Sequence, residues 1–201
     1  MMYNMAVKYF NEKNVVTPVG EAMFCKVNTI YDDYKGNKKY VVNMVFDEKN
    51  TKTMKAKFQK YLSDAKSLPE NEGKKWRNDE DRLGYREDEK TGKTWFTFKT
   101  KAFRNGEDGS EIQNYVPMFD EYGKPYGNDI VLGNGSKIQV SFDPSYYYES
   151  KDGNGLSMML KGILVHDLVE YSGGGSANAL GFVVKQPDLS ELMVGEDPFE
   201  D

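Results

Sequence analysis

TWFTFKTKAF, residues 94–103, alternates between two kinds of side chain at the period of a β-strand. One set is small or apolar enough for a core: Phe96, Phe98, Thr100 and Ala102. The other set combines aromatic rings with lysines: Trp95, Thr97, Lys99, Lys101 and Phe103. The stretch therefore predicts a strand that turns one face to the core and the other to solvent.

Four further stretches also indicate strands: 19–31, 39–46, 136–142 and 155–171. In the first, the expected core side comprises Met23, Cys25 and Val27, and the expected solvent side comprises Phe24, Lys26 and Asn28. In the third, the residues expected to face inward are Ile138, Val140 and Phe142. The fourth is long and apolar, and we expect a bend at Gly162.

Residues 51–68 form the one predicted helix, with Asn50 or Thr51 as its cap and Pro69 at its end. Its apolar side chains recur at helical spacing: Met54, Phe58, Tyr61, Leu62, Ala65 and Leu68. A charged segment, 69–93, follows the helix. Because residues 70–93 contain seven basic, eight acidic and few apolar side chains, we expect this segment on the surface rather than in the core.

Several strands with one early helix predict an all-β fold, a small closed or partly closed β-barrel. The OB-fold is the natural candidate, as a variant because of the position of the helix and the charged segment. We expect one domain over 1–171. A flexible linker, SGGGSANALG, then leads into a disordered acidic tail, so that linker and tail together cover 172–201.

Charge is distributed unevenly along the 201 residues. The net charge is −5, but the last part of the chain, from Asp188 onward, holds six acidic and no basic residues, which leaves +1 on residues 1–187. The lone Cys25 cannot form an internal disulfide, which fits a reducing compartment. No run approaches the roughly 18 apolar residues of a membrane span. We therefore expect a cytoplasmic protein that does not enter a membrane.

Catalysis has little support in the sequence. The single histidine, His166, lies in an apolar stretch, where a satisfied buried or half-buried imidazole is the ordinary interpretation. Cys25 has no second histidine with which to complete a catalytic pair or a metal cluster. GNGSK (133–137) lacks the spacing of a phosphate-binding loop and is better interpreted as a hairpin turn. We predict no enzymatic activity, no metal site and no cofactor.

Aromatic rings beside cations are more informative, since bases stack on rings and phosphates pair with positive charge. This pattern occurs in 94–103, in the hairpin 26–40, in KKWR (74–77) and in PSYYYESK (144–151). The candidate DNA-binding residues are Lys26, Tyr31, Tyr34, Lys38, Lys39, Trp76, Arg77, Trp95, Lys99, Lys101, Phe103, Arg104, Tyr146, Tyr147, Tyr148, Lys151 and Lys161. Packing is the alternative: Trp95 at a barrel end, Trp76 as an anchor of the charged segment, and the tyrosines at a strand edge.

Residues 133–171 resemble the C-terminal barrel segment of phage single-stranded DNA-binding proteins with an OB-fold. The matching elements are Gly135-Ser136-Lys137, the loop with Tyr146–Tyr148, the strand from Gly155-Leu156-Ser157 to Leu160-Lys161, and Leu168-Val169-Glu170-Tyr171. The resemblance implies a protein that binds single-stranded DNA independently of sequence. It would act in phage DNA replication, recombination or repair, in the host cytoplasm.

The resemblance also gives a role to the last residues, VGEDPFED (194–201). In that family an acidic tail with an aromatic residue competes with DNA and recruits polymerase, primase or helicase. The corresponding residues here are Glu196, Asp197, Phe199, Glu200 and Asp201. Two carboxylates follow the ring, whereas the family ends at the ring or close to it. A tail that only keeps the protein soluble is the simpler interpretation.

Three other functions stay open at this point. The first is a protein-interaction or virion assembly β-barrel without nucleic-acid binding, and the second is a metal-dependent nuclease that uses carboxylates. The third is RNA binding, because stacking alone does not distinguish the sugars. The sequence also leaves open whether the protein is a monomer or a homodimer.

Overall fold

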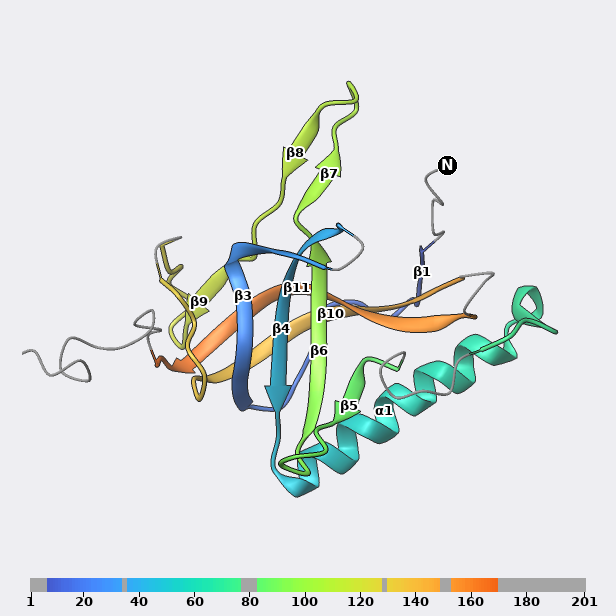
Figure 1. The fold of residues 1–201 in the computed structure, drawn as a ribbon, viewed down its shortest axis with the longest axis horizontal. Coiled ribbons are helices and arrows are strands. Elements are labelled where there is room, and N and C mark those ends of the chain that lie inside the picture. Colours follow the sequence, from blue (N-terminus) through green and yellow to red (C-terminus); the bar gives the residue numbers. More distant parts are fainter. Residues whose placement is uncertain (1–6, 34–35, 77–82, 128–129, 149–152, 170–201) are drawn as a thin grey trace, which may run out of the picture. The chain divides into compact units, whose positions relative to one another are not determined.

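Five strands close into a ring in a computed structural model, which describes residues 7–33, 36–76, 83–127, 130–148 and 153–169 (Figure 1). In order around the ring they are β3 (Gly20–Asp32), β4 (Lys38–Val45), β6 (Thr94–Lys101), β11 (Gly155–Asp167) and β10 (Lys137–Tyr147), which returns to β3. Four of the ladders are antiparallel, whereas β6 and β11 run parallel and share one registered pair, Lys99 with Met159. The ring confirms the predicted all-β barrel.

Shorter strands extend the ring. β1 (Val7–Tyr9) and β2 (Val15–Val16) pair with β10, β5 (Tyr85–Glu87) pairs with β6, and β9 (Met118–Asp120) runs parallel to β11. β7 (Phe103–Asn105) and β8 (Glu111–Gln113) form a separate two-stranded hairpin, which projects away from the ring beyond the end of β6 (Figure 1).

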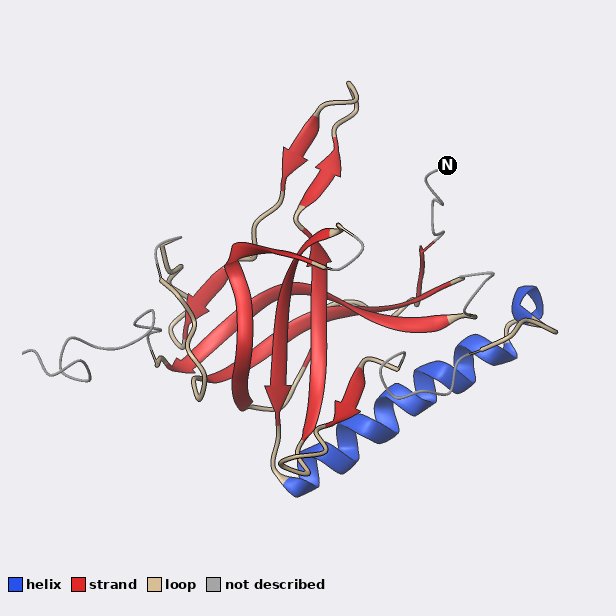
Figure 2. Cartoon of the chain, viewed as in Figure 1, coloured by secondary structure: helices blue, strands red, loops and turns tan. Residues whose placement is uncertain are grey.

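The predicted helix is α1 (Glu48–Ser67), the long blue element of Figure 2, followed by the 3-10 turn η1 (Pro69–Asn71). It starts before residue 51 because Asp47, and not Asn50 or Thr51, is its cap. The Asp47 carboxylate accepts a hydrogen bond of 2.7 Å from the backbone N–H of Asn50. Its buried face is the predicted one, with Met54, Phe58, Tyr61 and Ala65.

The core follows the alternation that the sequence predicts for β6 and β10. Phe96, Phe98 and Ala102 are fully buried, and so are Ile138, Val140 and Phe142. The helix packs on these side chains through the buried Phe58, whose ring centroid lies 5.6 Å from that of Phe96 and 6.0 Å from that of Phe142. The barrel and the helix therefore share one core.

The phase predicted for β3 is correct from Phe24 to Val27 but wrong at Met23, which lies on the outer face with Asn43. Ala22 is buried before residue 24 and Val27 is buried after it, which a regular alternation cannot give. The register supplies the reason: Met23 pairs with Asn43 and Lys26 pairs with Val41, so β3 carries one extra residue there. Such a β-bulge exchanges the two faces of a strand.

Part of the charged segment 69–93 belongs to the core, contrary to the prediction. Leu83 and Tyr85 are buried, because β5 adds to β6 and turns Tyr85 toward the helix, where its ring lies 6.3 Å from that of Phe58. Asn71 is buried as well, and its side-chain amide donates to the carbonyl of Ala65 at 2.7 Å. These few inward-facing side chains could not be predicted from the composition of the segment, because charged residues dominate it.

Some predictions concern residues outside the described ranges. They include the linker and the acidic tail, 172–201, and three candidate site residues, Tyr34, Arg77 and Lys151. Within the described ranges, no helix has the length and the apolar character that a membrane crossing requires.

Candidate functional site

Rows of residues across β3, β4 and β6 bring lysines together on the outer face of the barrel. In register, the rows are Met23, Asn43 and Thr97; then Lys26, Val41 and Lys99; then Tyr31, Lys39 and Lys101. Directly opposed side chains of neighbouring strands lie on the same face, about 5 Å apart. The pairing therefore unites residues that are far apart in the sequence.

A shallow groove of about 540 Å³ lies on this face, and we call it the basic groove. Its lining residues are Phe24, Lys26, Tyr31, Lys39, Val41, Asn43, Arg86, Trp95, Thr97 and Lys99. Four of these described residues carry a positive charge, three carry an aromatic ring, and none carries a carboxylate. Charge and rings together make this surface suited to a polyanion with flat, apolar parts.

The aromatic rings of the basic groove stand beside its cations. The ring centroids of Phe24 and Trp95 are 5.3 Å apart, with 32° between the ring planes. The register of β5 sets Arg86 opposite Trp95, and the guanidinium carbon lies 5.1 Å from the indole centroid. At the other end of the groove, Nζ of Lys39 lies 5.5 Å from the Tyr31 ring centroid. Each end of the groove thus places a cation beside a ring, and Nζ of Lys39 also lies 3.1 Å from the Asp33 carboxylate.

The floor between the two ends is only weakly polar. The Thr97 hydroxyl donates a hydrogen bond of 2.8 Å to the side-chain oxygen of Asn43, and the half-buried Val41 lies beside this pair. Cys25 is partly buried next to the same strands, and burial raises the pKa of its thiol to about 12. The thiol is therefore protonated near pH 7.

The structure brings several predicted site residues together. Five of them line the basic groove: Lys26, Tyr31, Lys39, Trp95 and Lys99. Lys101 continues the third row on β6, opposite Lys39. Beyond it, Nζ of Lys38 lies 5.7 Å from the ring centroid of Phe103, and the exposed Arg104 follows on β7. These residues extend the positive surface toward the β7–β8 hairpin.

Another group of predicted residues lies elsewhere. Tyr146 and Tyr147 belong to β10 rather than to a loop, and both are buried. Trp76 packs near Tyr146, with 6.1 Å between the ring centroids. Tyr148 is exposed, and Nζ of Lys74 lies 5.2 Å from its ring centroid. This group does not line the basic groove, because β10 and the start of the 69–93 segment hold it at another part of the barrel.

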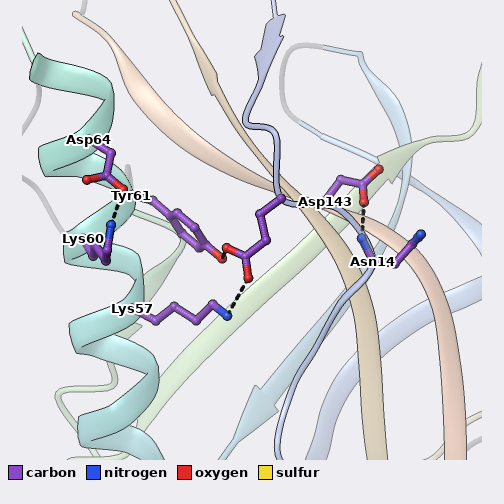
Figure 3. A network of polar contacts seen from close by, with 7 residues as sticks. Asn14, Lys57, Lys60, Tyr61, Asp64 and Asp143 are labelled. Atoms are coloured by element: carbon purple, nitrogen blue, oxygen red, sulfur yellow. Dashed lines mark hydrogen bonds and ion pairs between the residues drawn. The ribbon is translucent and has the colours of Figure 1, made fainter. Parts of the chain in front are cut away.

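Lys161 is also outside the basic groove and belongs to a polar network. Its Nζ lies 3.7 Å from the buried carboxylate of Asp143. That carboxylate accepts a 2.7 Å hydrogen bond from the backbone N–H of Asn14 (Figure 3). Nearby, Glu12 accepts from the Tyr61 hydroxyl at 2.7 Å and lies 3.1 Å from Nζ of Lys57. The hydrogen bond from Tyr61, together with Lys57, holds the pKa of Glu12 below its usual range. The network fixes the N-terminal segment to the helix and to β10.

Three important residues of this face escaped the sequence reasoning. The alternation predicts Phe24 on the solvent side with Lys26, as the structure has it, but does not identify it as a site residue. Arg86 lies in the charged segment, where solvation was the expected role. Asn134 belongs to the GNGSK turn, and its side-chain oxygen accepts a hydrogen bond of 2.6 Å from the backbone N–H of Phe24. The ring-and-cation pattern could have indicated Arg86, which lies next to Tyr85 in the sequence.

The titratable residues of the described part form no recognisable catalytic centre. His166 is exposed rather than buried as expected, and its Nε2 lies 2.9 Å from Oε1 of Gln139. It is exposed because it lies near the end of β11 on the solvent side. In the described ranges, no group of three or more His, Cys, Asp or Glu side chains is placed to hold a metal ion.

Comparison with solved structures finds the same architecture, although neither a family model nor a curated protein matches the sequence. The single-stranded DNA-binding protein gp2.5 of bacteriophage T7 aligns with a TM-score of 0.61 and 19% identity, over 90% of this chain and 98% of that one. The single-stranded DNA-binding protein of bacteriophage Enc34, in complex with single-stranded DNA, aligns with a TM-score of 0.59 and 11% identity, over 85% and 99%. The shared architecture confirms the predicted OB-fold.

Proposed function

We propose that this chain, which has the OB-fold of two phage single-stranded DNA-binding proteins, itself binds single-stranded DNA, and that it does so in the basic groove. The observation that carries the proposal is that four cations and three aromatic rings lie together on one outer face of β3, β4, β5 and β6. An OB-fold barrel presents its strands to nucleic acid in this way in other proteins.

The groove explains how binding could be independent of sequence. Lysine ammonium groups pair with phosphates, which every nucleotide carries. Rings stack on bases, and every base has an aromatic face. The weakly polar floor, with Val41 and the Asn43–Thr97 pair, gives few groups that could read the edge of a base. The protein would then act without catalytic chemistry and without a cofactor.

The finer part of the proposal concerns biological role and partners. We assign the chain to phage DNA replication, recombination or repair in the host cytoplasm. The acidic tail would compete with DNA for the basic groove and recruit polymerase, primase or helicase. Its residues are Glu196, Asp197, Phe199, Glu200 and Asp201. The charge distribution supports this: six carboxylates and no basic residue from Asp188 onward, against a groove lined by four cations.

The first prediction concerns Trp95, which lies beside Phe24 and Arg86 in the basic groove. We expect Trp95→Ala to weaken binding of an unstructured thymidine oligomer about tenfold, because it removes an aromatic surface of the groove and the ring that contacts Phe24. Loss of one stacking contact is worth about 1–3 kcal/mol, and the lower part of this range applies to a half-buried indole. Anisotropy of a dye-labelled oligomer measures the affinity. Tyr122→Ala is the matched control, because Tyr122 is exposed and outside the groove. Unchanged affinity in a folded Trp95→Ala protein would remove Trp95 from the site.

The second prediction concerns the acidic tail. We expect the truncated chain 1–187 to bind the thymidine oligomer more tightly than the full chain, most clearly at low salt, because the competing carboxylates are gone. Both proteins are titrated at several salt concentrations, where log K should fall with log salt by about 0.7 per phosphate neutralised. Equal affinities of two folded proteins would refute competition by the tail. Absence of binding by both would favour a protein-interaction barrel.

A further inference from the structure

Phe24 combines an exposed ring with an unfavourable backbone conformation. Its side chain is 56% exposed, and its φ of 47° lies in the left-handed region. Among the described residues other than glycine, only Asn14 and Phe24 have positive φ. Asparagine tolerates this region, whereas a bulky residue there is a genuine outlier. Strained residues of this kind cluster at functional sites, so the position of the Phe24 side chain is a candidate for function.

The bulge in β3 decides where the Phe24 ring points. Gly20 and Ala22 face the core, so an unbroken strand would also turn residue 24 inward. The extra residue between the Met23–Asn43 and Lys26–Val41 pairs breaks this alternation. As a result the ring leaves the barrel interior and enters the basic groove.

Asn134 holds the bulge from outside the strand. Its side-chain oxygen accepts the 2.6 Å hydrogen bond from the N–H of Phe24. On the same edge of β3, the N–H of Ala22 donates to the carbonyl of Ser136 at 2.9 Å. The same turn is joined to β3 by a 2.9 Å hydrogen bond from the N–H of Gly135 to the carbonyl of Ala22. The GNGSK turn thus clamps the strained residue and fixes the direction of its side chain.

Trp95 supports this ring from behind. Arg86 approaches the indole from β5, and Phe24 approaches it from the β3 side of β6. The indole is half-buried beside these two neighbours, so it offers a base less open surface than Phe24 does. Phe24, by contrast, contacts Trp95 on one side and is open to solvent on the other.

We infer that Phe24 is the ring on which a base stacks at this end of the groove, with Trp95 as its support and Asn134 as a positioning residue. The inference rests on the proposed binding of single-stranded DNA. In this interpretation the bulge and the GNGSK turn contribute to binding, because they direct the side chain of residue 24 away from the core and expose its ring to a base.

The test compares affinity with stability in variants of the full chain. Phe24→Asn suits the left-handed conformation, so we expect a melting temperature equal to or above that of the wild type, together with affinity for the thymidine oligomer that is lower by about tenfold. Phe24→Leu keeps apolar volume without a ring and should lose a similar factor. Phe24→Tyr keeps the ring and should bind within about twofold of the wild type.

Asn134→Ala tests the clamp. We expect it to weaken binding several-fold in the wild-type background and hardly at all in the Phe24→Asn background, because a positioning residue acts only through the ring that it positions. Additive losses in the double variant would overturn the positioning role. If Phe24→Asn and Phe24→Leu bind as well as the wild type, the inference about Phe24 is overturned while the proposed function stands. A wild-type chain that does not bind the oligomer overturns both.

Discussion

Replacing Lys26, Lys39 and Lys99 together by glutamine should weaken binding of the thymidine oligomer about a hundredfold at about 0.1 M salt. Each phosphate contact releases about 0.7 of a counterion from a single strand, which is worth a factor of about five at that salt concentration. Three contacts multiply to about a hundredfold, and the slope of log K against log salt should become shallower by about 2. Anisotropy titrations at four or five salt concentrations measure both quantities.

The matched control removes the same charge elsewhere. Lys49, Lys60 and Lys66 are exposed on α1 and do not line the basic groove. Their triple replacement by glutamine changes the net charge equally, and we expect a loss of affinity of less than about threefold, because exposed charges beyond a Debye length of about 10 Å are largely screened. Similar losses in the two triple variants would mean that overall charge, and not the groove, holds the DNA.

Phe58→Ala should lower the free energy of unfolding by about 3–5 kcal/mol, the range for removal of a fully buried phenylalanine. Phe58 has 0% exposed surface and contacts rings from the helix, from β5, from β6 and from β10. The cavity would open where the helix meets the barrel, and the packed side chains of the barrel wall cannot collapse into it without leaving their strands.

Urea unfolding followed by circular dichroism measures this change. Phe58→Leu keeps much of the volume and should lose clearly less, whereas Tyr122→Ala, at a side chain that is 87% exposed, should change stability by no more than about 0.5 kcal/mol. A loss below about 1 kcal/mol for Phe58→Ala would mean that the helix contributes little to the core of the barrel.

Much of the fold could be predicted because its signals are periodic. The period of two on β6 and β10 gave the correct inward side chains, such as Phe98 and Val140, and the helical spacing gave Phe58 and Ala65. A barrel followed from the number of strands and the single helix. These patterns repeat over many residues, so one exception does not hide them.

Local geometry was beyond the reach of such patterns. The bulge at Phe24 depends on one added residue and on a hydrogen bond from Asn134, which is distant in sequence. The cap at Asp47 was missed because Asn50 and Thr51 are equally good capping residues. The sequence predicts a loop at Tyr146 and Tyr147, but β10 continues through both, and nothing in the tyrosine triplet indicates where the strand ends.

For the candidate site, the sequence identified one strand of the basic groove, β6, and only part of the residues that line it. Trp95 and Lys99 were identifiable because they lie on the outward side of a strongly alternating strand. Their partners on β3, β4 and β5 depend on register, and register is set by bulges and turns that composition does not reveal. Tyr148 and Lys161 have the right chemistry, but the topology places them outside the groove.

The seam between β6 and β11 has a consequence for how the barrel moves. Its two strands share a single registered pair, Lys99 with Met159, while β4 is joined to β6 by a long ladder. Fewer registered backbone pairs therefore hold β6 to β11 than join any other two neighbouring strands of the ring. We expect local opening of the barrel to begin at this seam, because separation of its strands breaks the fewest backbone hydrogen bonds.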